Sequence, residues 1–125
     1  MNSTSDVHLA VRRADGFLAR LKGLMFERSI GPDTGLWINR CNAIHTFFMR
    51  FPIDVIFLDR DLKVVKLCPN APPYRLGPFC RGAASVLEFA SGFIARTGIT
   101  ESHALEFDSK SDLALGLAAA RFRIS

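Results

Sequence analysis

Apolar and polar residues alternate over short stretches along much of the chain, and this pattern predicts β-strands. Successive side chains of a strand point to opposite faces, so alternation gathers the apolar ones on one face of a sheet. Stretches rich in valine, isoleucine and phenylalanine favour the same structure, because branched and aromatic side chains pack well on a pleated surface. The strands predicted in this way cover residues 7–13, 35–39, 43–49, 53–59, 62–68, 84–89 and 103–107.

Helical spacing of apolar residues is confined to a few segments. Residues 17–26 carry apolar side chains three and four positions apart, which predicts a helix. Residues 93–97 predict a single helical turn closed by Gly98. Residues 113–122 have a helix-forming composition, so we expect a short docking helix or a partly ordered end there. A proline-rich loop with little regular structure is expected over residues 69–81.

The length of 125 residues is typical of one domain. We expect that domain to span residues 7–108, after a flexible N-terminal segment (residues 1–6) and before a C-terminal tail (residues 109–125). The number and spacing of the strands predict an α+β fold that is mainly β. Its core is expected to be a compact antiparallel sheet, barrel-like in shape, with one or two short helices.

The amino-acid composition predicts a core rich in phenylalanine, and it gives the chain a small net charge. Eleven phenylalanines against one tryptophan and one tyrosine supply rings without polar atoms, which indicates packing and not recognition. The net charge of +4 gathers between residues 62 and 87, where Lys63, Lys66, Arg75 and Arg81 stand without an acid. Such a stretch more often forms a solvated face than an anion site, and it does not predict nucleic acid as a partner.

Cysteine usage and the N-terminal residues bear on the compartment. Three cysteines are an odd number and form no CxxC pair, so a disulfide framework is not expected. The first residues do not resemble a signal peptide, and no apolar run reaches the about 18 residues of a transmembrane helix. We therefore expect a soluble cytoplasmic protein with reduced thiols; an exported, periplasmic location is the alternative if a leader precedes this sequence.

One apolar segment contains an unusual set of polar and sulfur-bearing residues: Cys41, His45, Thr46 and Met49. On a regular strand Cys41 and His45 share a face. A cysteine beside a histidine can form a thiolate nucleophile with its base, or begin a zinc or copper site that Met49 or Glu88 completes. The simpler interpretation makes His45 a hydrogen-bonded core residue and Cys41 a small apolar one. Without a third spaced ligand, the sequence predicts neither a metal nor a cofactor.

Two carboxylates, Asp54 and Glu88, stand inside apolar strands. A buried carboxylate must be paired or hydrogen-bonded, because burying it alone costs several kcal/mol. Candidate partners of Asp54 are Arg20, Arg50 and backbone donors near Pro52. The favoured interpretation is that Asp54 fixes the corner of the chain at Pro52. The alternative is that Asp54 and Glu88 together perform acid–base chemistry or hold a divalent ion.

Three blocks of sequence carry a resemblance to a known family. The blocks are Arg20-x-x-Gly23-Leu24-Met25, His45-Thr46-Phe47-Phe48-Met49-x-x-Pro52-Ile53-Asp54, and Val86-Leu87-Glu88 followed by Gly92. In order and spacing they resemble the signature of the domain of unknown function 192 (DUF192) family, over about residues 7–107. The resemblance implies a small, mainly β domain of bacteria or archaea, often exported, with no accepted activity, cofactor or catalytic residue. Two features depart from the family pattern: the absence of a leader, and Thr100-Glu101-Ser102 where many members have Gly-Asp.

Three functions remain open, and the favoured one is a non-enzymatic binding or accessory domain with a pocket near residues 45–54. The residues expected to line this pocket are Arg20, Cys41, His45, Thr46, Met49, Asp54 and Glu88. The residues expected to contact an anionic or carbohydrate-like ligand, or a partner protein, are Lys66, Tyr74, Arg75 and Arg81. One alternative is a hydrolase-like, thiol or carboxylate enzyme that uses Cys41 with His45 or Asp54 with Glu88. The other is a structural accessory of the cell envelope or of secretion.

Overall fold

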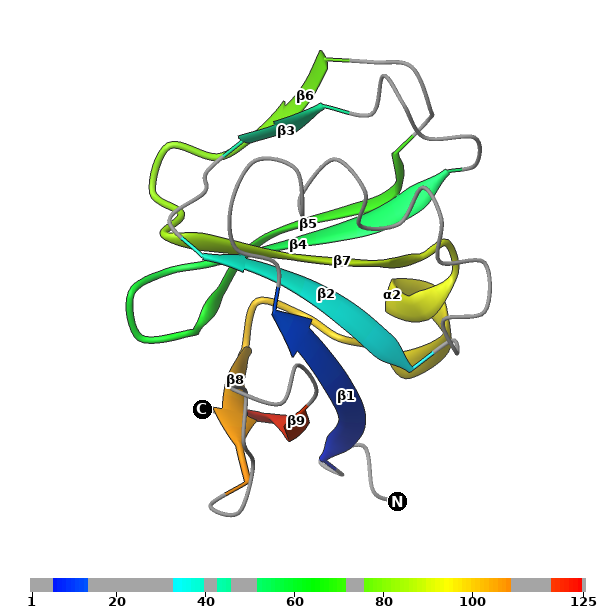
Figure 1. The fold of residues 1–125 in the computed structure, drawn as a ribbon, viewed down its shortest axis with the longest axis vertical. Coiled ribbons are helices and arrows are strands. Elements are labelled where there is room, and N and C mark those ends of the chain that lie inside the picture. Colours follow the sequence, from blue (N-terminus) through cyan, green and yellow to red (C-terminus); the bar gives the residue numbers. More distant parts are fainter. Residues whose placement is uncertain are drawn as a thin grey trace.

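The fold is mainly β, as the alternation predicts (Figure 1). The computed structural model of the chain describes residues 6–13, 33–39, 43–45, 52–71, 76–108 and 118–124. Within them lie the strands β1 (Val7–Arg13), β2 (Thr34–Asn39), β3 (Ala43–His45), β4 (Ile53–Leu58), β5 (Val64–Ala71), β6 (Leu76–Phe79), β7 (Ser85–Ala90), β8 (His103–Phe107) and β9 (Ala118–Ile124), and the helix α2 (Phe93–Thr97).

Seven of these strands form one curled sheet in the order β5-β4-β7-β2-β1-β9-β8. All neighbours are antiparallel except β1 and β2, which run parallel. The sheet curls into a half-barrel (Figure 1), and contacts connect the region of β5 to that of β8, its two edge strands. An isolated bridge between Lys63 and Ala104 joins them, and the Leu105 N–H donates to the Leu62 carbonyl at 2.8 Å. This contact covers part of two strand edges that would otherwise be open to pairing with another chain.

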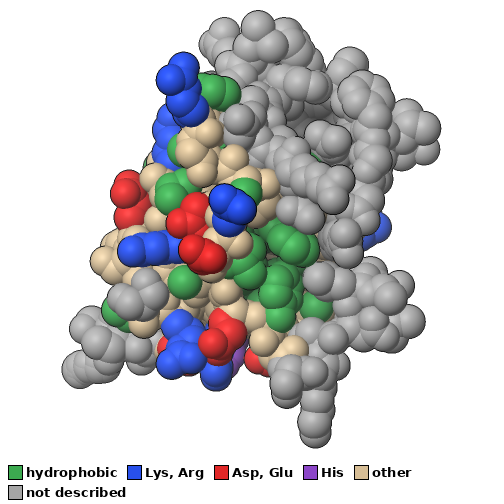
Figure 2. All heavy atoms as spheres, turned by 90° about the vertical axis from the view of Figure 1, so that its left-hand side faces the viewer, with side chains coloured by type: hydrophobic (Ala, Val, Ile, Leu, Met, Phe, Trp, Pro, Cys, Tyr) green, Lys and Arg blue, Asp and Glu red, His purple; other side chains and the backbone are tan. Residues whose placement is uncertain are grey.

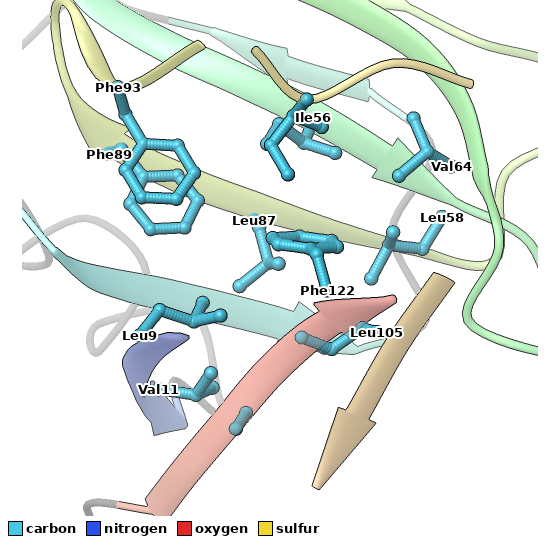
Figure 3. Packing of buried hydrophobic residues seen from close by; sticks show 12 residues of the cluster. Leu9, Val11, Ile56, Leu58, Val64, Leu87, Phe89, Phe93, Leu105 and Phe122 are labelled. Atoms are coloured by element: carbon cyan, nitrogen blue, oxygen red, sulfur yellow. The ribbon is translucent and has the colours of Figure 1, made fainter. Parts of the chain in front are cut away.

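The concave side of the sheet holds the main apolar core (Figure 3). Strands far apart in the sheet order contribute to it, which is possible only on the inside of the curl. Its buried members are Leu9, Val11, Ile56, Leu58, Val64, Leu87, Phe89, Phe93, Ile99, Leu105, Ala120 and Phe122. The rings of Phe89 and Phe93 stack with centroids 3.7 Å apart. Gly35 of β2 lies against this stack, and a Cβ there would fall 2.6 Å from the Phe89 ring, so the position leaves no space for a side chain.

The helical turn α2 begins and ends as the sequence predicts. Gly92 precedes it with φ of 108° and Gly98 follows it with φ of 73°, a backbone conformation that glycine adopts without steric penalty. The Gly98 N–H donates to the Ile94 carbonyl at 3.0 Å and closes the turn. Phe93 anchors the helix in the core.

The convex side of β4, β5 and β7 carries a second apolar cluster. Its buried members are Ile53, Val55, Phe57, Ala71 and Val86, and Cys68 and Cys80 pack against them. The small two-stranded sheet β3–β6 is connected to this side, because Lys66 Nζ donates to the Phe79 carbonyl at 2.7 Å and Cys80 follows directly. Strand β4 is therefore buried on both faces, as its six consecutive buried residues show.

Two sequence expectations need correction, and others lie outside the described residues. Ala118–Ile124 is a strand and not a helix, because it occupies the place between β1 and β8 and its residues 118, 120 and 122 alternate into the core. The segment 69–81 is more regular than expected, because β5 extends to Ala71 and Leu76–Phe79 forms β6. The helix expected over residues 17–26, and the second half of the strand expected over 43–49, lie outside the described residues.

Candidate functional site

Glu88 is a buried carboxyl in the middle of the convex face of the sheet. It lies on β7, and its cross-strand neighbours are Val55 of β4 and Leu36 of β2, both buried. Only 7% of Glu88 is exposed. Along its own strand the next residue on the same face is Val86, which is fully buried. The carboxyl is therefore surrounded by aliphatic side chains on at least three sides.

This environment changes the acidity of Glu88. Burial raises the pKa of its carboxyl from 4.5 to about 7, because an apolar environment disfavours the ionised form. Within the described part of the chain, no hydrogen bond or ion pair reaches this carboxyl. A group with such a pKa is half ionised near neutral pH, so it can donate a hydrogen bond in one state and accept a cation in the other.

Lys66 lies on the same face as Glu88, two strands away, and holds the small sheet in place. It pairs across strands with Phe57, and its Nζ lies 6.0 Å from the centroid of that ring. The hydrogen bond to the Phe79 carbonyl joins β5 to the end of β6. Lys66 was predicted to contact a ligand; one of the three N–H donors of its ammonium group binds the backbone, and contact with a ligand stays a prediction. Arg81 is exposed in the turn that follows β6.

Asp54 is fully buried, but its side chain lies on the opposite face from Glu88. Its cross-strand neighbour is Phe89, whereas Glu88 pairs with Val55. The Asp54 carboxylate accepts hydrogen bonds from the backbone N–H groups of Asn70 at 2.9 Å and Ile94 at 2.7 Å. These bonds join β4 to the end of β5 and to the first turn of α2. Asp54 thus fixes the positions of Asn70 and Ile94, while Arg20 and Arg50, its candidate partners, lie outside the described residues.

The two carboxylates consequently do not form the acid–base pair that the sequence left open. The two residues are one position out of phase across the β4–β7 ladder, so alternation directs their side chains to opposite faces. The sheet itself separates them. Among the described residues, no group of three or more histidine, cysteine or acidic side chains is arranged to hold a metal ion.

The other predicted pocket residues fall largely outside the described part of the chain. This applies to Arg20, Cys41, Thr46, Met49, Tyr74 and Arg75. The backbone of His45 is described: it lies on β3 and pairs with Leu76 of β6. The motif around His45 therefore enters the small sheet that is joined to the convex face, the face on which Glu88 lies.

A pair of cysteines on this face was not among the site residues predicted from the sequence. Cys68 and Cys80 are free, half-buried, and pack against the same apolar cluster. Cys68 directly precedes the proline-rich stretch and Cys80 lies near its end, and this placement was the available signal. Burial raises the pKa of the Cys68 thiol, and a nearby Cys80 thiolate would raise it further, while the Lys66 charge opposes both effects.

Charged side chains of both signs mix on the side of the molecule shown in Figure 2. One ion-paired group on the surface is centred on Glu106, which binds Arg121 at 2.6 Å and Arg123 at 3.0 Å. These hydrogen bonds lower the pKa of Glu106. Such exposed pairs contribute little to stability and need no functional explanation.

The comparisons with known proteins agree on one family for this chain. Residues 1–107 match the family model DUF192, described as an uncharacterized ACR. A UPF0127 protein of Pyrococcus furiosus is 34% identical over 109 residues, which cover 82% of this chain and 90% of that protein. A UPF0127 protein of Thermococcus kodakarensis is 35% identical over 98 residues, or 75% of this chain, and the match spans only 62% of that relative's length.

Two solved bacterial structures share the fold. A protein of unknown function from Novosphingobium aromaticivorans superposes with a TM-score of 0.63 at 29% identity, over 72% of this chain and 69% of that one. A protein from Sinorhizobium meliloti titled a putative transcription regulator has a TM-score of 0.65 at 23% identity, over 80% of this chain and 92% of that one; this likeness concerns the fold alone. No helix among the residues searched is long and apolar enough to cross a membrane.

Proposed function

This chain belongs to the DUF192 family of uncharacterised proteins, and we propose that it is a binding domain whose site is the convex face around Glu88. The ligand we propose is a small molecule with an apolar body and a protonated amine. The apolar body would contact the aliphatic side chains of β2, β4 and β7, and the amine would pair with the Glu88 carboxylate.

The observation that carries this proposal is a carboxyl in an apolar environment with no partner among the described residues. Proteins seldom keep such a group unless it is paired, because a buried carboxyl without a hydrogen bond destabilises the fold. An amine supplies both a counter-charge and a hydrogen-bond donor. Charge-assisted hydrogen bonds of this kind are about twice as strong as neutral ones.

Binding is favoured over catalysis by what surrounds Glu88. Acid–base hydrolysis with paired carboxyl groups needs a second one nearby, and Asp54 lies on the other face with both oxygens bonded to the backbone. An anionic ligand is disfavoured too, because the polar group at the centre of this face is itself a carboxyl. The thiol enzyme that uses Cys41 and His45, and the envelope or secretion accessory, stay as predictions.

The test compares two probes that differ only in the polar group, n-hexylamine and 1-hexanol. Titration of the isotopically labelled protein, followed by amide chemical shifts, gives both the affinity and the location of the site. We expect the amine to bind more tightly than the alcohol and to shift amides of β2, β4 and β7. Because Glu88 must ionise, amine affinity should rise about tenfold between pH 6 and pH 8 for a pKa of about 7.

The Glu88→Gln variant should bind the amine no better than the alcohol, at either pH. Glu106→Gln removes an exposed carboxylate from another strand and should leave amine binding unchanged, as a matched control. Equal binding of both probes by the wild type and the Glu88→Gln variant would overturn the proposal. Amide shifts confined to the surface around Glu106 would overturn it as well.

A further inference from the structure

The convex face carries a second feature that the proposed ligand does not contact. This feature is the pair of cysteines Cys68, on β5, and Cys80, directly after β6. We infer that Cys68 and Cys80 form a dithiol pair that a low-molecular-weight disulfide can oxidise to an intramolecular disulfide. The bond would join β5 to the end of β6 and hold the small sheet against the convex face. The inference does not depend on the ligand proposed for Glu88.

Three observations bring Cys68 and Cys80 to the same part of the convex face. Both side chains pack against the same buried cluster. Cys68 lies two residues after Lys66 on β5, so the two side chains share a face. Lys66 in turn holds the carbonyl of Phe79, whose peptide bond leads directly to Cys80. The side chain of Lys66 thus spans from the strand of Cys68 to the residue before Cys80.

Electrostatics agrees with this placement. The charge of a Cys80 thiolate acts on Cys68, and Lys66 favours the Cys68 thiolate against the effect of burial. Both cysteines are half-buried and not enclosed, so a small oxidant can reach them. Burial outweighs the Lys66 charge, so the pKa of Cys68 stays above its ordinary value, and the thiolate that performs the exchange becomes more abundant as the pH rises.

The reaction proceeds by two exchanges with oxidised glutathione as the oxidant. One cysteine thiolate attacks the oxidant's disulfide, forms a mixed disulfide and releases one glutathione thiolate. The second cysteine thiolate then attacks the protein sulfur of the mixed disulfide and releases the other glutathione. Two electrons pass from the protein to the oxidant, and the two protons of the cysteines end on the released thiols or in water.

Mass spectrometry of the native protein tests the inference, because trypsin cleaves between the two cysteines. Cleavage after Lys66, Arg75 and Arg81 gives the separate peptides 67–75 and 76–81. After oxidation, alkylation of the remaining thiols and digestion without reductant, we expect these peptides to appear as one joined species lighter by two hydrogens. The number of alkylated cysteines should fall from three to one.

Three variants make the result specific. Cys41→Ser should form the joined species as the wild type does, whereas Cys68→Ser and Cys80→Ser should lose it and carry glutathione on the remaining cysteine of the pair. Glu88→Gln should cross-link like the wild type, which separates this inference from the ligand proposal. Glutathione on both cysteines of the wild type without a link between them, or a dominant link through Cys41, would overturn the inference.

Discussion

Replacement of Glu88 by glutamine should stabilise the protein at alkaline pH and leave its stability almost unchanged in acid. Glutamine has nearly the same shape but never ionises. The wild-type carboxyl, in contrast, must either ionise among Val55, Leu36 and Val86 or keep a proton that the unfolded chain gives up. The difference in unfolding free energy between the wild type and Glu88→Gln therefore measures how much the buried charge destabilises the fold.

The sign and size follow from the pKa. The folded chain holds the proton up to about pH 7, whereas the unfolded chain releases it near pH 4.5. Below pH 4.5 both states are protonated and the wild type bears no penalty. As the pH rises from 4.5 to 7, the free energy of unfolding falls by about 1.4 kcal/mol per pH unit. The full penalty, about 3 kcal/mol, is present above pH 7 and corresponds to a loss in Tm on the order of 10 °C.

Urea unfolding of wild type and Glu88→Gln at pH 4, 6 and 8 measures this directly. The difference in unfolding free energy between the two proteins should grow by about 3 kcal/mol from pH 4 to pH 8. Glu106→Gln is the matched control. Its effect on stability should change with pH in the opposite direction, because pairing lowers the pKa of Glu106. Since these pairs are exposed, the wild type should exceed that variant in stability only slightly at neutral pH and lose the advantage in acid. Parallel pH profiles of the wild type and Glu88→Gln would refute the reasoning about burial.

Three further substitutions test the fold by urea unfolding at neutral pH. Asp54→Asn should cost about 1–3 kcal/mol, because an amide offers one acceptor oxygen to two backbone N–H donors. Gly35→Ala should cost about 1–3 kcal/mol, because the new Cβ would lie 2.6 Å from the buried Phe89 ring, whereas Gly82→Ala meets no atom within 4 Å and should be close to neutral. Phe122→Ala should cost about 3–5 kcal/mol, because the ring is fully buried.

Each of these has an outcome that contradicts it. A neutral Asp54→Asn would mean that the two backbone donors find other partners. Equal changes in unfolding free energy for Gly35→Ala and Gly82→Ala would mean that the sheet accommodates a side chain at position 35 without loss of stability. A neutral Phe122→Ala would show that β9 does not belong to the core.

Local patterns in the sequence were enough to place most strands. Alternation and branched residues identified β1, β2, β4, β7 and β8 nearly to their ends, because the period of two reflects a half-buried sheet surface. The two glycines around α2 marked its limits for a similar reason, since each adopts a positive φ that other residues avoid. The family signature was also readable in the sequence, and the DUF192 match confirms it.

The C-terminal strand shows where local information ends. The alanines of residues 118–120 favour a helix in isolation. Their strand conformation is imposed by β1, which pairs with all three, and by Phe107 of β8, which pairs with Ala120. Because β1 lies at the other end of the chain, burial and ladder hydrogen bonds override the local preference only once the sheet has formed.

For the candidate site, too, some features could be predicted from the sequence and others could not. The sequence by itself determined that Asp54 and Glu88 are carboxylates inside apolar strands and therefore need an explanation. Only the tertiary structure decided what each one does. The register of β4 against β7 puts them out of phase, so Asp54 meets backbone donors on the concave side while Glu88 faces the aliphatic convex side. Register depends on contacts between residues 27 to 37 positions apart in the sequence, from Leu58 with Ser85 to Ile53 with Ala90, and a shift of a single residue would have placed both carboxylates on one face.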